Sequence, residues 1–360
     1  MDFGIFSHGF RPHTTAAQTY EEDIHEIVLA DKLGFRDAWI SEHHGEPLYM
    51  NRVDTLPVPE LMMCKASALT TRIRMGAAVN VIHLQHPVDT AIRAATTDHI
   101  VGDGRFMFGF GSGFSNPMFT DERGLTYEDR HPRMMEALEL ILRCWESEEP
   151  FDWNGTHWKG KGITALPKPF RKPHMPIATA SETDATLRMA AERGYGLLTA
   201  MLETPRGIRR KTDIYARAAL AAGRSLPLNS VSSARIIYIA DSHREAVEDI
   251  REGASHEIGF QRERGMLHAM SKMLKLGKSA DELTFDFFVE SGVYVIGDPD
   301  SVAKQLRTFY DECGGFGTLL VITGKSWATQ EKRARSLTRF MQEVAPQLRG
   351  LEPTPMPVAA

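Results

Sequence analysis

Short apolar runs alternate with amphipathic stretches along the whole chain. The apolar runs are rich in Ile, Val, Phe and Ala and show little strict alternation, which is typical of parallel strands buried on both faces. They predict strands over residues 2–7, 36–41, 73–82, 105–111, 175–180, 195–200, 233–240 and 317–323. The amphipathic stretches predict helices near 20–33, 58–70, 87–101, 128–147, 183–193, 204–222, 242–274 and 329–345.

Eight strand–helix units in alternation predict an α/β fold, a (β/α)8 TIM barrel with insertions. A doubly wound sheet explains the same pattern less well, because eight units exceed its usual count. Gly34 and Gly194 follow predicted helices and are expected as their C-caps. Ser181 or Thr183 is expected to cap the helix that follows the fifth strand.

The chain is expected to form one domain over residues 1–349. Two segments fall outside the regular units. The segment 148–174 contains Asn154-Gly155 between aromatic residues, which predicts a hairpin. The segment 250–295 is longer than one unit needs and is a candidate lid, with a solvated helical insertion or a dimer contact as the alternatives. Residues 350–360 contain three prolines and are expected to form a disordered tail.

Charge and cysteine usage narrow the class of protein. The formal net charge is -5 and no basic stripe is present, so a nucleic-acid partner is not expected. The longest apolar runs are too short to cross a bilayer, and the N-terminus lacks the pattern of a secretory signal. Cys64, Cys144 and Cys313 are scattered without metal or redox spacing. Buried thiols in a reducing cytoplasm are the expected interpretation.

Glu42, His43 and His44 directly follow the predicted strand 36–41. In a β/α barrel the loops at the carboxyl ends of the strands carry the chemistry. Histidine titrates near neutral pH and can therefore accept or donate a proton there. Successive strand residues point to opposite faces, so only one of His43 and His44 is expected to face the barrel mouth. A purely structural role for either histidine is the alternative.

Small residues mark the strand 73–82, where Gly76, Ala77 and Ala78 leave room for a flat ring against the backbone. Asn80 is expected near the strand end, with both a donor and an acceptor. Close packing of helix against strand explains the small residues equally well. Of the two histidines that follow, His86 is expected in a loop or at a helix start, and His83 is left open.

Glycines at alternate positions, Gly109, Gly111 and Gly113, clear side chains from one face of the strand 105–111 and its exit. A bulky group is therefore expected to approach the backbone there. Relief of crowding inside the barrel is the alternative.

A third pattern lies at the start of the helix after the fifth strand. The hydroxyls of Ser181 and Thr183, with the exposed N–H groups of that helix start, can hold a phosphate. Simple helix capping is the alternative, and the acidic Glu182 argues against a direct contact of its own side chain with phosphate.

These segments together resemble the bacterial luciferase-like flavin monooxygenase superfamily over roughly residues 1–345. The resemblance rests on Phe-Gly-Ile-Phe at the first strand, Ala-Trp-Ile-Ser-Glu-His-His, Arg-Ile-Arg-Met-Gly, the following His-Pro, Gly-Arg-Phe-Met-Phe-Gly-Phe-Gly-Ser-Gly, and Ala-Ala-Glu-Arg-Gly after the fifth strand. The opening His8-Gly9-Phe10-Arg11-Pro12 is similar to the terpene-oxidising branch, which includes limonene and diketocamphane monooxygenases.

The resemblance implies a barrel that binds reduced FMN supplied by a separate flavin reductase. Oxygen would add at the flavin C4a position, and the resulting (hydro)peroxyflavin would transfer one oxygen atom to a small apolar substrate of terpene, ketone or aldehyde type. His43 would be catalytic, with His44 beside it. The positions that match the family's cofactor site are Ala77, Asn80, Gly111, Ser112, Ser181, Glu182 and Thr183.

The expected pocket and assembly follow the same resemblance. His8, Phe10, Phe114 and Trp327 are expected to line the substrate pocket, and a cytoplasmic homodimer is expected. The chain departs from luciferase at Gly111 and Ser112, where luciferase carries a cysteine and an arginine. The reactive thiol and one phosphate-binding cation are therefore absent at these positions.

Three other functions remain open. A relative that uses a deazaflavin would transfer hydride without oxygen. A metal-dependent barrel hydrolase would draw on Glu42, His43, His44, His83 and His86, but adjacent histidines diverge on a strand and metal ligands must converge, so no metal is expected. A non-catalytic flavin-binding barrel is the third. The sequence does not distinguish hydroxylation, epoxidation and Baeyer–Villiger insertion.

Overall fold

A computed structural model describes residues 1–9, 11, 14–43, 56–113, 129–263, 265–273 and 276–353 of the chain. Eight parallel strands close into a barrel, in which each strand pairs with its neighbour and β9 joins β10. The barrel strands are β1 (Asp2–Ser7), β2 (Asp37–Ile40), β3 (Arg74–Ala77), β5 (Phe106–Gly111), β8 (Ile177–Thr179), β9 (Gly196–Leu198), β10 (Val231–Ile239) and β12 (Thr318–Ile322). The predicted (β/α)8 barrel is therefore confirmed.

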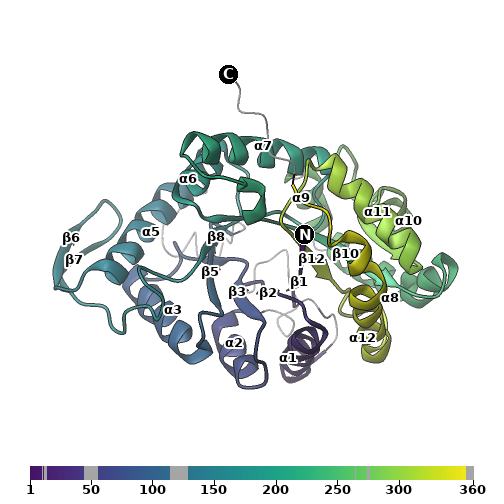
Figure 1. The fold of residues 1–360 in the computed structure, drawn as a ribbon, viewed down its shortest axis with the longest axis horizontal. Helices are drawn as coiled ribbons and strands as arrows, with labels where there is room; N and C mark the ends of the chain where they lie inside the picture. The colour runs from purple at the N-terminus through teal and green to yellow at the C-terminus, as the bar shows by residue number, and fades with distance from the viewer. Residues whose placement is uncertain are drawn as a thin grey trace.

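Helices surround this barrel (Figure 1). They are α1 (Ala16–Leu33), α2 (Pro59–Ser67), α3 (Pro87–Val101), α5 (Arg130–Glu146), α6 (Asp184–Arg193), α7 (Pro205–Ala221), α8 (His243–Glu263), α9 (Met266–Met273), α10 (Phe285–Glu290), α11 (Pro299–Glu312), α12 (Gln330–Arg339) and α13 (Ala345–Leu348). A 3-10 turn at Pro227–Ser230 precedes β10, and a π-helical turn at Phe340–Val344 joins α12 to α13.

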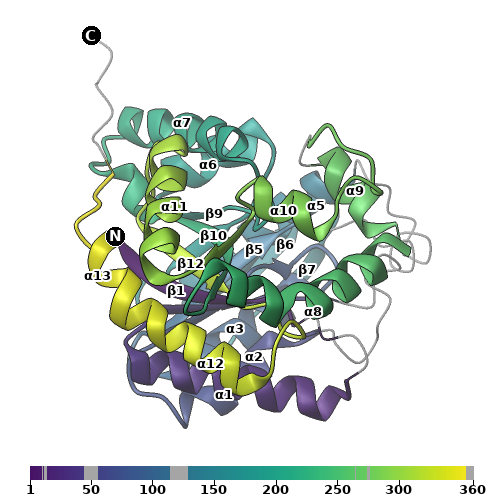
Figure 2. The ribbon, with the colours of Figure 1, turned by 90° about the vertical axis from the view of Figure 1, so that its right-hand side faces the viewer.

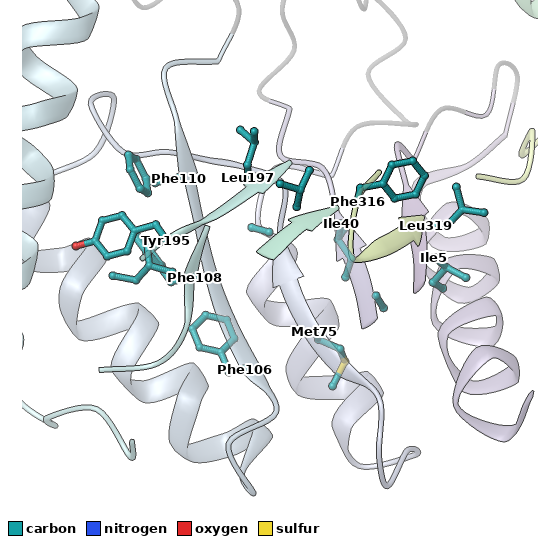
Figure 3. Close-up of a cluster of buried hydrophobic side chains, with 14 of the residues drawn as sticks. Ile5, Ile40, Met75, Phe106, Phe108, Phe110, Tyr195, Leu197, Phe316 and Leu319 are labelled. Atoms are coloured by element: carbon teal, nitrogen blue, oxygen red, sulfur yellow. The ribbon is translucent and has the colours of Figure 1, made fainter. Parts of the chain in front are cut away.

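Alternate residues of each strand belong to two different apolar clusters. Phe106, Phe108 and Phe110 of β5 pack outward against the helices, in the cluster partly drawn in Figure 3. Met107 of β5 and Trp39 of β2 belong to the second cluster, on the opposite face of the strands, which in a closed barrel is the interior. This second cluster continues from the barrel interior into α8, α9 and α10.

One strand–helix unit was not predicted. β11 (Tyr294–Gly297) and α11 lie between β10 and β12 in the chain. Ile236 of β10 is paired with Tyr294 of β11 and with Ile322 of β12, so these two strands lie on opposite edges of β10. β9 and β11 share one edge of β10. β9 pairs with Val231 and Ser232 at the start of β10, and β11 pairs with the residues from Ile236 onward. β11 is thus an extra strand beside the barrel.

The predicted turn and cap signals are largely confirmed. Gly34 and Gly194 end α1 and α6 with φ of 90° and 75°, a left-handed conformation that glycine adopts without steric cost. Thr183 is the N-cap of α6. The predicted hairpin is the antiparallel pair β6 (Phe151–Asn154) and β7 (Lys159–Ile163), which projects beside α5 in Figure 1.

The segment 250–295 is not a single element. It contains the end of α8, α9 and α10, and its apolar side chains pack into the interior cluster. In Figure 2, β1 runs from the N-terminus toward the side on which α9 lies, so α9 is at the carboxyl end of the barrel. The segment is therefore a packed cover on that side.

The end of the chain is ordered as far as it is described. The ammonium group of Met1 donates hydrogen bonds to the carbonyl oxygens of Leu351 at 2.7 Å and Arg349 at 3.0 Å. Leu351 packs against the outer cluster. The predicted disordered tail is therefore wrong for residues 350–353, and residues 354–360 lie outside the described residues.

Candidate active site

The candidate residues lie at the carboxyl ends of neighbouring strands. Around the barrel, β12, β1, β2, β3 and β5 are consecutive, and β8 follows β5. Trp327, His8 and His43 follow β12, β1 and β2, in that order. The short strand β4 (Asn80–Val81) extends β3 and pairs with β5, and Ser181 follows β8. The predicted site residues that are described thus form one continuous arc on one end of the barrel.

The space beside the glycines of β5 is occupied by the protein itself. A Cβ atom at Gly109 would overlap the carbonyl oxygen of Ala77, and one at Gly111 would overlap the side chain of Val79. A Cβ atom at Gly113 would lie 3.0 Å from a methyl group of Val81. The groups that approach these glycines are therefore parts of the β3–β4 segment, which packs closely against β5, and a cofactor contact at Gly111 stays a prediction.

Gly76 of β3 is also packed against another part of the protein. The flat ring that lies against this residue is the indole of Trp39, whose Cζ3 would be 2.6 Å from a Cβ atom at position 76. Ala77 points its methyl group into the outer cluster, so only its backbone faces the site. Ala78 and Val79 are half-buried and pack against the interior cluster instead. Between β3 and β4, the side chains that face the barrel interior are therefore those of Ala78 and Val79.

His43 is half-buried at the end of β2, where its backbone N–H donates to the carbonyl oxygen of Leu56 at 3.3 Å. His8, one residue beyond β1, interacts electrostatically with it. Burial and the positive charge of Lys325 together lower the pKa of His8 to about 3, although Asp23 opposes the shift. His8 is therefore a neutral imidazole beside His43 throughout the neutral pH range.

A cluster of ion pairs lies behind His8. Its cations are Arg11, Lys325 and Arg333, and its acids are Glu22, Asp23 and Glu26. Arg11 donates to Asp23 at 2.8 Å, and Lys325, which is fully buried, lies 3.3 Å from Asp23. Burial raises the pKa of Asp23, but Lys325 and Arg11 outweigh this effect and lower it to about 2. The cluster therefore pairs three basic with three acidic side chains.

Asn80 does not direct its side chain into the barrel. With its amide nitrogen as donor, it bonds to Glu42 at 2.7 Å and to Glu60 of α2 at 3.0 Å. Glu42 also accepts from the backbone N–H of Val81 at 3.4 Å, and both carboxyl groups are buried. Burial raises the pKa of Glu60, although the charge of Arg93 opposes this, and Glu42 raises it further. The Asn80 amide thus bridges two buried carboxyl groups, and its contact with a cofactor stays a prediction.

Polar groups converge where β5 and β8 end. Phe110 pairs with Thr179, and Ser112 and Ser181 each lie two residues beyond this pair. The guanidinium of Arg130, the first residue of α5, donates to the carbonyl oxygens of Gly113 at 3.0 Å and Ser112 at 3.4 Å. A buried cation thus stands at the exit of β5.

The start of α6 is tied to the start of α5. Ser181 Oγ accepts from the N–H of Thr183 at 3.1 Å, and the Thr183 hydroxyl donates to Thr186 at 2.9 Å. The hydroxyl of Thr186 lies 2.7 Å from Nε2 of His131. The predicted capping role of Thr183 is confirmed, and the capped turn lies next to Arg130.

Glu182 is half-exposed and turned toward α7. Its carboxylate pairs with the ammonium group of Lys211, which is 2% exposed and lies 2.9 Å from the buried Glu203. Glu182 is therefore held by a cation beside the α6 start.

Trp327 is buried in the interior cluster. Its indole N–H donates to Glu257 of α8 at 2.7 Å, and its ring centroid lies 4.5 Å from that of Tyr294. Trp327 therefore joins the β12 exit to the helical cover. Three of the predicted site residues, His44, Phe10 and Phe114, lie outside the described residues.

Four residues near these candidates were not singled out in the sequence. Arg130 and Lys211 lie in helices whose patterns indicated only amphipathic packing, and Ala78 and Val79 were not separated from Ala77. A signal existed for Arg130, because a basic residue at a helix start is unfavourable for the helix dipole unless an acceptor or an anion lies there. His86 is the N-cap of α3, as expected, and His83 is buried.

The described residues contain neither a metal-ligand cluster nor a membrane-spanning helix. No three His, Cys, Asp or Glu side chains in that part of the chain converge as metal ligands. None of its helices combines the length and the apolar character that crossing a bilayer requires. Cys64, Cys144 and Cys313 are free thiols.

Comparison with known proteins shows the protein family to which the chain belongs. A family model described as luciferase-like monooxygenase matches residues 1–315. Limonene 1,2-monooxygenase of Rhodococcus erythropolis is 26% identical over 359 residues, 97% of this chain and 87% of that protein. The oxygenase component of flavin-dependent trigonelline monooxygenase from Acinetobacter baylyi is 26% identical over 368 residues, 96% of this chain and 95% of that protein.

A solved structure agrees with these sequence matches. The oxygenating constituent of 3,6-diketocamphane monooxygenase from Pseudomonas putida, a type II Baeyer–Villiger monooxygenase in complex with FMN, superimposes with a TM-score of 0.82. It is 25% identical, and the match covers 98% of this chain and 99% of that one. The barrel, the arc of polar residues at its carboxyl end and these matches show that the chain belongs to the luciferase-like monooxygenase family.

Proposed function

We propose that this protein is the oxygenase component of a two-component monooxygenase, which uses reduced FMN and O2 to insert one oxygen atom into a small apolar substrate. The observation that carries the proposal is the arc that places His43, the β3–β4 segment and the α6 start on neighbouring strand ends. Membership of the luciferase-like family supports it, as does the FMN bound to the diketocamphane monooxygenase component.

The donor set at the end of β5 and β8 fits the phosphate of FMN. Arg130 supplies a permanent positive charge, and the Ser181 hydroxyl and the first amides of α6 supply neutral donors. Arginine matches phosphate oxygens with a planar fork of N–H groups. Arg130 thus provides the cation that the sequence lacks at Ser112.

The flavin ring would lie along Ala78 and Val79, the half-buried residues between β3 and β4 that pack against the interior cluster. Reduced FMN with O2 supplies the oxygen-transfer chemistry when it is bound. His43, at the end of the neighbouring strand β2, would then be the histidine beside the ring.

His43 would hold or deliver a proton at its imidazole, since histidine titrates near neutral pH. His8 adds no positive charge beside it, because burial keeps the pKa of His8 at about 3. The packed α8–α10 cover and Trp327 shield this side of the site from water, and exclusion of water prevents the loss of reactive intermediates to side reactions.

The substrate is proposed to be a terpene, ketone or aldehyde of modest size. The interior cluster around the mouth consists of apolar side chains, including Trp39, Met107, Leu198 and Ile322. A pocket with such walls favours an apolar substrate. His8 and Trp327 contribute to the walls on the β1 and β12 side, and Phe10 and Phe114 remain predictions for the loops outside the described residues.

The functional test separates oxygenation from hydride transfer. Purified protein is supplied with reduced FMN, O2 and a panel of cyclic terpenes, ketones and long-chain aldehydes, and products are identified by mass spectrometry. We expect an oxygenated product with FMN and no turnover with a reduced deazaflavin. Turnover only with the deazaflavin would replace this proposal by the hydride-transfer alternative.

His43→Ala is the matching variant. General acid–base residues contribute about 10²–10⁴-fold to rate. We expect FMN to bind normally to this variant and product formation to fall by about that factor. Unchanged product formation would remove His43 from the chemistry.

Partners and assembly complete the proposal. A separate flavin reductase is proposed as a transient partner, because the similar trigonelline enzyme is named as an oxygenase component. We propose a cytoplasmic homodimer through helices on one side of the barrel. Leu61, Leu69 and Ile100, on or beside α2 and α3, are 70%, 56% and 57% exposed. These apolar side chains are candidates for the contact.

A further inference from the structure

Glu182 stands next to the two hydroxyl residues that we propose to bind phosphate, and a bare carboxylate there would repel the ligand. The structure removes this conflict by pairing Glu182 with Lys211 of α7. Lys211 is 2% exposed, so its charge is poorly screened by solvent. Glu182 itself is 47% exposed, so solvent screens part of the attraction between the two charges.

Lys211 is itself fixed from the other side. Its ammonium group lies 2.9 Å from Glu203, which is 3% exposed, and Glu203 also accepts from the N–H of Ala200 at 3.4 Å. Arg235 donates to the carbonyl oxygens of Glu203 at 2.6 Å and Met201 at 3.1 Å. The ammonium group is therefore held in one place between the β9 exit and the α6 start.

We infer that Lys211 is a positioning residue for the phosphate end of the cofactor: it holds and neutralises Glu182, so that the loop 181–183 can accept an anion. The inference rests on the proposed function. Lys211 acts through Glu182 and is assigned no contact with the cofactor. Its removal would leave Glu182 and Glu203 as two uncompensated carboxylates at the edge of the site.

A second pair joins the same helices and behaves differently. Arg210, adjacent to Lys211 in α7, pairs with Asp184 in the first turn of α6, but both side chains are about half-exposed. Exposed ion pairs are screened and contribute about 0–1 kcal/mol. The buried Lys211 therefore exerts the stronger electrostatic control over the loop.

Comparing FMN with riboflavin isolates this effect, because riboflavin lacks only the phosphate. The affinities of both flavins are measured by fluorescence titration for the full-length protein. We expect the wild type to bind FMN at least about tenfold more tightly, and Lys211→Met to reduce the FMN-to-riboflavin affinity ratio by about tenfold, equivalent to about 1.4 kcal/mol. Lys332→Met removes a lysine paired with Asp249 away from the site, and is expected to leave the ratio unchanged.

Two further variants test the mechanism through Glu182. The exposed substitution Glu182→Gln is expected to maintain or raise the ratio, and Lys211→Met/Glu182→Gln is expected to restore most of it. Equal weakening of both flavins in Lys211→Met, without rescue by Glu182→Gln, would show that Lys211 is only structural. If Lys211→Met does not fold, a fall of the ratio in Glu182→Gln overturns the inference. A wild type that does not distinguish the flavins would contradict the proposed phosphate site itself, and the inference with it.

Discussion

His8 lies one residue beyond β1, beside three cations and three acids. An unfolded histidine takes up a proton near pH 6.5, whereas folded His8 stays neutral down to a pKa of about 3. Between these values the unfolded state binds one more proton, so acid favours unfolding. His8 should therefore destabilise the fold progressively as the pH falls from about 6.5 to 3, by about 1.4 kcal/mol per pH unit.

The prediction is that His8→Gln flattens the dependence of unfolding free energy on pH between 6.5 and 4. Denaturant titrations at several pH values measure this slope. His268→Gln, at an exposed histidine of α9, is the control and should retain the slope of the wild type. Parallel curves for the wild type and His8→Gln would show that His8 is protonated in the folded protein.

The Asn80 bridge gives a second residue-scale prediction. Replacement by Leu removes the donor shared by two buried carboxyl groups. Leaving a buried acceptor without its donor costs about 1–3 kcal/mol, and more when it is charged. We expect Asn80→Leu to lower the free energy of unfolding by about 2–4 kcal/mol, and an added Glu60→Gln to recover part of the loss. A neutral effect of Asn80→Leu would contradict the bridge.

At the scale of elements, the packing of α8 on the exit of β12 depends on a glycine. A Cβ atom at Gly253 would overlap the carbonyl oxygen of Ser326 and lie 2.6 Å from the Cα of Trp327. At Gly259, in the same helix, no atom lies within 4 Å of such a Cβ. Gly253 is therefore a contact position and Gly259 a solvent-accessible helix position.

This pair allows a matched test. Gly253→Ala should destabilise the protein by about 1–3 kcal/mol through overpacking. Gly259→Ala should stabilise it by up to about 1 kcal/mol, because alanine favours the helix. Thermal and denaturant unfolding of the two variants measure the difference. Effects of the same sign would mean that α8 does not lie against Trp327 as described.

The sequence predicts the strands of the barrel well but misses one strand–helix unit. All eight barrel strands were found because Ile, Val and Phe runs bounded by glycine report burial on both faces. β11 and α11 were missed because Tyr294–Gly297 is short and begins at the end of the stretch 250–295, which was interpreted as an insertion. Local patterns do not reveal that such a strand adds to the edge of β10.

The site was less predictable than the fold. The motifs correctly placed His43, Ser181 and Thr183 just after strands, because each of these residues closely follows an apolar run in the sequence. The partners of Asn80 and Glu182 could not be predicted, since Glu60 and Lys211 reach them from other helices. The spaces beside Gly76 and Gly109 are filled by Trp39 and Ala77. Only the three-dimensional packing reveals these contacts.

At the scale of the whole molecule, the proposed dimer is testable through the ends of α2 and α3. Arg105 donates to Thr70 at 3.1 Å and to the carbonyl oxygen of Val101 at 2.9 Å, so these helix ends lie together. Leu69→Arg/Ile100→Arg places two charges on this surface without touching the core. We expect a dimeric wild type and a monomeric variant by light scattering after gel filtration. A variant that remains dimeric would move the contact to another face.

The function of the whole molecule is tested most directly by isotope incorporation. Purified protein is supplied with chemically reduced FMN, ¹⁸O2 and the substrate panel, and the mass of each product is determined by mass spectrometry. We expect a product that carries one ¹⁸O atom, and we expect its formation to be strongly reduced in His43→Ala. Consumption of reduced FMN that yields only hydrogen peroxide across the panel, or a product without ¹⁸O, would contradict it.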